Sequence, residues 1–162
     1  MRFAEASDAG ATTPQKINFV FTTPVQILYS GPSPQVPPKH PSNQVDMVVI
    51  PGSDGTMGIL PNHANTVAQL NPGVVMVQET ADSPIVKYFI SGGFAIMKNS
   101  NLSITAVEAV PLEELDPAAV TEGLEKYRKE MESETDPLAK AKAQIAFEVH
   151  TAMNSALGDI KH

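Results

Sequence analysis

The side chains of this sequence that could do chemistry include four histidines, His40, His63, His150 and His162. Their separations match no metal-ligand spacing, and the absence of cysteine excludes a thiolate zinc site and a thiol nucleophile. His63 is of most interest because it follows an expected turn. A histidine in that position usually hydrogen-bonds the backbone of its own loop. We therefore favour a structural role for His63 over catalysis, and a solvated or edge position for His150.

The glycine-rich segment 52–58 is a second candidate for chemistry. A phosphate-binding loop ends in Gly-Lys-Ser/Thr, and this segment contains no lysine. The chain also has no Gly-x-Ser-x-Gly motif, which marks an acyl-transfer nucleophile. The sequence thus predicts no catalytic residue, no cofactor and no metal site. A hydrolase built around His63 and Asp54 is kept as one alternative.

Composition excludes several functional classes. The 162 residues carry a formal net charge of -7, from 11 Lys and Arg against 18 Asp and Glu. An acidic chain without clustered cations is a poor binder of nucleic acid. No apolar run approaches the roughly 18 residues that a transmembrane helix needs, so we expect no membrane insertion. Glu5 and Asp8 argue against an intact organellar presequence, so the chain stays where it is made or is a processed form.

Short runs rich in Val, Ile, Phe, Tyr and Thr fill the first two-thirds of the chain, and they predict strands. Turn-forming residues such as Asn71-Pro72-Gly73 separate them, with no long helical pattern in between. This rhythm is typical of a sandwich or flattened barrel. The predicted strands are residues 16–21, 25–30, 45–51, 66–70, 74–80, 85–91, 94–98 and 102–107, with 58–60 as a shorter extended piece.

The last third of the chain predicts two helices. Asp116-Pro117 and Asp136-Pro137 repeat one start signal, an Asp N-cap followed by Pro at the first helical position. The link 133–136 is so short that it forces an antiparallel hairpin. Each helix buries only one face, so the remaining apolar surface must meet the sheet or a partner. The apolar stripes at helical spacing are Val120, Leu124, Tyr127 and Met131 in the first helix, and Leu138, Ala141, Ile145, Val149, Ala152 and Ala156 in the second.

These patterns predict a β + α fold: an N-terminal antiparallel β-sandwich of about 8–10 strands, then a C-terminal antiparallel two-helix hairpin. We divide the chain into an N-terminal extension (1–15), a sandwich domain (16–111) and the hairpin (112–162). The sandwich contains a proline-rich insertion, residues 31–43. We interpret this insertion as an extended surface loop rather than a ligand for a proline-recognition domain.

The segment Gly58-Ile59-Leu60-Pro61-Asn62-His63-Ala64 resembles the signature of the ATP synthase delta/epsilon subunit family, called delta in mitochondria and epsilon in bacteria and chloroplasts. The resemblance continues, in order, over about residues 16–157. Its segment 87–95 is similar to the mitochondrial members. Further matching segments are 17–21, 23–29, 49–55, 70–75 and 106–110.

The resemblance implies a non-catalytic subunit of the central stalk, or rotor, of the proton-translocating ATP synthase. Such a subunit couples rotation of the membrane c-ring to the gamma subunit, and so to ATP synthesis. The expected location is the matrix side of the mitochondrial inner membrane, as a peripheral part of the complex. The expected partners are gamma, the c-ring and, on the hairpin, the further small subunit that mitochondria call epsilon.

The resemblance also implies an interface with the c-ring along residues 53–63. Asp54, Thr56 and Met57 would face the ring beside Ser53, while Pro61 and His63 would hold the turn.

The sequence departs from the family at a nucleotide-binding motif. Some bacterial members bind ATP through Ile/Leu-Asp-x-x-Arg-Ala, and Ala119 stands here in place of the Arg. We therefore expect no ATP binding. The runner-up interpretation is a stand-alone β-sandwich binding module with a helical tail.

Overall fold

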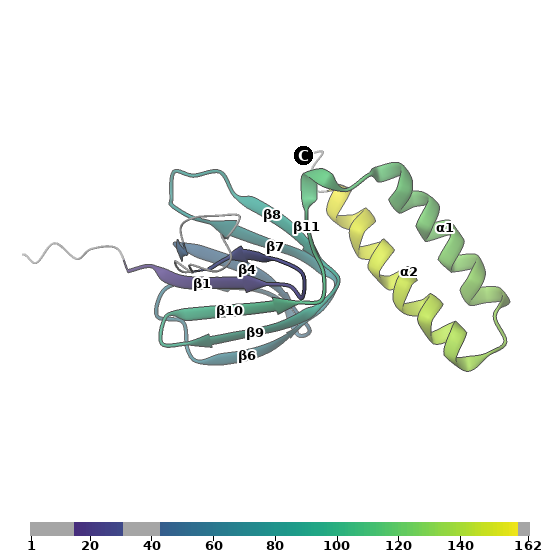
Figure 1. The fold of residues 1–162 in the computed structure, drawn as a ribbon, viewed down its shortest axis with the longest axis horizontal. Helices are drawn as coiled ribbons and strands as arrows, with labels where there is room; N and C mark the ends of the chain where they lie inside the picture. The colour runs from purple at the N-terminus through teal and green to yellow at the C-terminus, as the bar shows by residue number, and fades with distance from the viewer. Residues whose placement is uncertain (1–14, 31–42, 159–162) are drawn as a thin grey trace, which may run out of the picture.

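The computed structural model describes residues 15–30 and 43–158 (Figure 1). The expectations for the N-terminal extension and the proline-rich insertion therefore fall almost wholly outside the described residues, as do His40 and His162.

Eleven strands among the described residues form one curled sheet. Figure 1 shows it folded into two layers, with β6, β9 and β10 on one side and β4, β7 and β8 on the other. The strand order is β11-β8-β7-β4-β6-β9-β10-β1-β2, with β3 beside β1 and β5 beside β4. The strands are β1 (Ile17–Thr22), β2 (Ile27–Tyr29), β3 (Gln44–Val45), β4 (Met47–Gly52), β5 (Gly55–Ile59), β6 (Thr66–Leu70), β7 (Gly73–Gln78), β8 (Val86–Ile90), β9 (Gly93–Lys98), β10 (Asn101–Ala106) and β11 (Ala109–Pro111).

The predicted fold class is confirmed, with two corrections. First, β1 pairs with β10 in parallel, Asn18 opposite Asn101 and Thr22 opposite Thr105, whereas every strand was expected to be antiparallel. These strands are far apart in sequence, so no tight turn dictates their relative direction. Second, the strand count exceeds 8–10 because β3 and β11, which are two and three residues long, are too short to give a periodic signal.

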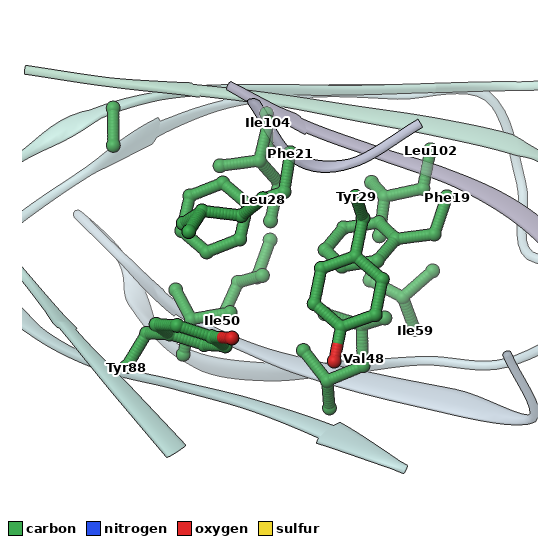
Figure 2. Close-up of a cluster of buried hydrophobic side chains, with 14 of the residues drawn as sticks. Phe19, Phe21, Leu28, Tyr29, Val48, Ile50, Ile59, Tyr88, Leu102 and Ile104 are labelled. Carbon is green, nitrogen blue, oxygen red and sulfur yellow. The ribbon is translucent and has the colours of Figure 1, made fainter. Parts of the chain in front are cut away.

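The core lies between the two layers, and Figure 2 shows the rings of Phe19, Phe21, Tyr29 and Tyr88 among aliphatic side chains within it. Burial alternates strictly along β1, where Ile17, Phe19 and Phe21 are fully buried. Phe21 and Tyr88 meet edge to face, with ring centroids 5.5 Å apart. Burying each of these large side chains stabilises the sandwich by roughly 2–3 kcal/mol.

Gly93 allows three strands to approach closely. It lies between Leu70 of β6 and Ala106 of β10, with φ +156°. A Cβ built on it would overlap the carbonyl oxygen of Thr105 and lie 2.8 Å from Cα of Ala106. A glycine is therefore required where β9 begins.

The hairpin consists of α1 (Pro117–Ser133) and α2 (Pro137–Gly158), which follow a short 3-10 turn, Leu112–Glu114. Both predicted N-caps are confirmed. Oδ1 of Asp116 accepts a hydrogen bond from the backbone N–H of Ala118 at 2.9 Å, and Oδ2 of Asp136 accepts one from Ala139 at 3.0 Å. Figure 1 shows the two arms side by side, projecting from one end of the sandwich.

Only part of the predicted α2 stripe is covered. At its C-terminal end, Val149, Ala152 and Ala156 pack with Phe89 and Leu112 of the sandwich side. At its N-terminal end the stripe is open: Leu138 is 64% exposed, Ile145 is 62% exposed, and Ala141 is exposed as well. The covered half attaches the hairpin to the sandwich, and the open half is available to a partner.

Candidate functional site

Segment 53–63, the expected ring interface, is two turns joined by a strand rather than one loop. Gly52 of β4 pairs with Gly55 of β5, so Ser53 and Asp54 form a two-residue hairpin turn. β5 then leads to a second turn that begins at Leu60. The two turns lie at opposite ends of β5, roughly 15 Å apart at about 3.4 Å per residue.

The first turn is polar and open to solvent. Ser53, Asp54 and Thr56 are all exposed. The backbone N–H of Ser53 donates to the carbonyl of Gln69 at 2.9 Å, which fixes the turn to β6. Met57 is half-buried and packs against the core, so its side chain supports the turn from below.

The second turn is held by His63 and its neighbours. The N–H of His63 donates to the carbonyl of Leu60 at 3.1 Å, and Asn62 adopts the left-handed conformation, φ 64°. Nδ1 of His63 lies 2.9 Å from the carbonyl oxygen of Ala64. His63 thus hydrogen-bonds the backbone of its own loop, as expected for a structural role, and Pro61 lies half-buried in the same turn.

This geometry contradicts the hydrolase alternative. Asp54 and His63 lie at opposite ends of β5, well beyond the hydrogen-bond reach that a general base and its orienting acid need. Among the described residues, no three His, Asp or Glu side chains gather as a metal site would require.

An exposed apolar face on β6 and β9 was not predicted from the sequence. Val67, Phe94 and Ile96 are 74%, 57% and 50% exposed. Val67 pairs with Ile96, and Phe94 pairs with Gln69, so the three side chains share one outer face. The signal was the unbroken apolar run 94–97, because a strand with one solvated face normally alternates with polar residues.

A shallow notch of about 470 Å³ continues this face toward the hairpin. Pro24, Phe94 and Val107 line it from the sandwich, and Ile145 and Val149 line it from α2. Phe94 belongs to the outer face of β6 and β9 and also lines the notch, and Ile145 belongs to the open half of the α2 stripe and also lines the notch. The three apolar surfaces therefore adjoin one another.

Comparison with known proteins gives the family. The family model described as "ATP synthase, Delta/Epsilon chain, beta-sandwich domain" matches residues 39–112. The mitochondrial ATP synthase subunit delta' of Ipomoea batatas is 42% identical over 146 residues, which cover 80% of this chain and 72% of that protein. The mitochondrial subunit delta of Kluyveromyces lactis is 40% identical over 96% of this chain and 86% of its own length.

The chain belongs to the ATP synthase delta/epsilon subunit family.

A solved structure agrees over almost the whole chain. One chain in the cryo-EM structure of the Euglena gracilis mitochondrial ATP synthase, described as OSCP/F1/c-ring, is similar with a TM-score of 0.75 and 29% identity. The match covers 97% of this chain and 91% of that one. The predicted family and its mitochondrial setting are confirmed: this is a delta-type subunit of the mitochondrial ATP synthase. No helix among the described residues has the length and apolarity to cross a membrane.

Proposed function

We propose that this delta/epsilon-family chain is a passive mechanical coupler in the rotor, on the matrix side of the inner membrane. It would clamp gamma, rest on the c-ring and pass rotation between them, without an active site or bound nucleotide. The observation that carries the proposal is the division of the surface: an apolar outer face on one part of a close-packed β block and a polar turn on another. A close-packed two-layer block transmits force with little deformation.

Gamma is the partner we propose for the apolar face of β6 and β9. Stable partners bury apolar, aromatic-containing surface. Val67, Phe94 and Ile96 supply such a surface outside the core, and Val107 extends it into the notch.

The c-ring is the partner we propose for the first turn. Ser53, Asp54 and Thr56 present a hydroxyl, a carboxylate and a second hydroxyl to solvent at the tip of a β-hairpin. Met57 supports this tip, whereas Pro61 and His63 shape the opposite end of β5, so we assign these three residues to holding the segment rather than to touching the ring.

The small mitochondrial epsilon subunit is the partner we propose for the hairpin. Leu138, Ala141 and Ile145 form an exposed apolar stripe on α2 next to the notch. A helical face of this kind is suited to a second amphipathic segment.

Association tests the proposal. We expect the tagged chain, purified from its source mitochondria in mild detergent, to bring gamma and the c subunit with it in a fixed ratio that survives moderate salt. A chain that purifies alone, or with a peptide or sugar ligand, would support the stand-alone binding module instead.

A further inference from the structure

Gly123 of α1 lies directly against the imidazole ring of His150 of α2. A Cβ built on Gly123 would overlap Cδ2 and Nε2 of His150, so the imidazole ring occupies the space in which any other side chain would stand. Glycine is among the poorest helix formers, and its presence inside α1 therefore needs a packing reason. The ring of His150 supplies that reason.

Two further contacts fix the orientation of the ring. Nδ1 of His150 lies 2.8 Å from the carbonyl oxygen of Ala146, one turn earlier in α2, so Nδ1 carries the proton of that hydrogen bond. The ring centroid lies 4.9 Å from that of Tyr127 on α1. The imidazole is thus hydrogen-bonded to its own helix and held between Gly123 and Tyr127 of the other.

The geometry points to His150 as a positioning residue that sets the rotation and register of α2 against α1. Ala139 and Ala143 of α2, which line a hollow together with Tyr127, are small and would tolerate sliding. A ring inserted over a glycine does not, because rotating or shifting either helix drives it into the neighbouring backbone.

The consequence concerns the open α2 stripe. Ile145 precedes His150 by five residues, which places it roughly 140° around the helix at 3.6 residues per turn. Fixing the imidazole against α1 therefore fixes the direction in which Leu138, Ala141 and Ile145 face. That direction matters for assembly only if the stripe binds a partner, so this part of the inference rests on the proposed function.

The first test uses the sign of a stability change. Gly→Ala in an unobstructed helix interior raises stability, because Ala is the better helix former. Here we expect Gly123→Ala to lower the melting temperature of the helical circular dichroism signal by about 3–8 °C, as overpacking would. Adding His150→Ala to Gly123→Ala should remove that loss, whereas Glu122→Ala, on the exposed side of α1, serves as the control and should change little.

The second test measures position. The chain has no cysteine, so nitroxide labels can be attached at Glu125→Cys on α1 and Lys140→Cys on α2, both exposed positions. In the full chain, we expect the label-to-label distance distribution from pulsed electron paramagnetic resonance to broaden in His150→Ala and to shift in Gly123→Ala. His150→Phe, which keeps a ring over Gly123, should restore the wild-type distribution.

These outcomes decide the proposal independently of the partners. A rise in melting temperature for Gly123→Ala, or an unchanged distance distribution in His150→Ala, would overturn it. Failure of the wild-type chain to co-purify with gamma would contradict the proposed function and leave the distance measurement to decide the role of His150.

Discussion

Val67 on β6 and Ile96 on β9 lie directly opposite each other on the outer face of the sandwich, and both are largely exposed. Cross-strand pairs of β-branched residues normally help to stabilise a sheet from its buried face. Here the pair adds apolar surface on the side away from the core. We attribute that surface to the contact with gamma proposed above.

The first prediction follows from this pair. Val67→Asp should lower the yield of co-purified gamma by tenfold or more, because a carboxylate would be desolvated in the interface. Ile85→Asp is the matched control: Ile85 is also exposed, but it lies in the β7–β8 connection. Equal recovery of gamma with both variants would remove the β6–β9 face from the interface.

The second prediction concerns the first turn. Asp54→Lys should weaken retention of the c-ring, through reversed charge, without unfolding the chain. Gly58→Leu should do the same through bulk, since a Cβ at Gly58 meets nothing within 4 Å and the larger side chain would point outward. Asp82→Lys makes the same charge change in another exposed turn and should retain the ring. Normal ring recovery with Asp54→Lys and Gly58→Leu would mean that the ring contacts another part of the chain.

The third prediction is that ATP does not bind. Ala119 is exposed near the start of α1 and offers no cation to a phosphate. Millimolar ATP should leave the melting temperature of the chain unchanged, because a ligand raises it only by binding the folded state. An ATP-dependent rise of several degrees, absent with AMP as a control, would show that the chain has a nucleotide site and contradict the prediction.

The fourth prediction is a loss of stability at high pH. Tyr88 is fully buried, and burial raises its pKa to about 12; burial likewise raises the pKa of Tyr29. An unfolded tyrosine ionises near pH 10, so the unfolded chain loses these protons first, and stability falls as pH rises from about 10. For Tyr88 alone, the free energy of unfolding falls by about 2 kcal/mol between pH 10 and pH 12.

Thermal melts from pH 8 to 12 test this, with Tyr88→Phe as the comparison. Above pH 10, the melting temperature of the variant should fall less steeply with pH than that of the wild type. Parallel falls in the two proteins would assign the alkaline loss to other groups.

Much of the fold can be predicted from local sequence patterns. Asp116 and Asp136 begin their helices as expected, because an N-cap bond involves residues only two or three positions apart. The alternation of Ile17, Phe19 and Phe21 likewise predicts which face of β1 is buried. The parallel pairing of β1 with β10 could not be predicted in this way, because the same alternation of buried and exposed residues fits a parallel or an antiparallel neighbour.

The candidate interaction surfaces were harder to predict from the sequence than the strands and helices. The residues of segment 53–63 are close together in the sequence, yet the intervening strand places Asp54 and His63 beyond opposite ends of β5. The face containing Val67, Phe94 and Ile96 emerges only once β6 and β9 are paired in register. The notch additionally requires the position of α2 against the sandwich, which depends on tertiary packing at Phe89 and Ala156.

The most direct test of the coupling role compares ATP hydrolysis with proton pumping in membranes whose ATP synthase carries Val67→Asp. If Val67→Asp no longer binds gamma, ATP hydrolysis should stay close to wild type while ATP-driven acidification falls severalfold. The control Ile85→Asp should retain both activities. Full proton pumping in membranes from which this chain is demonstrably absent would contradict the account.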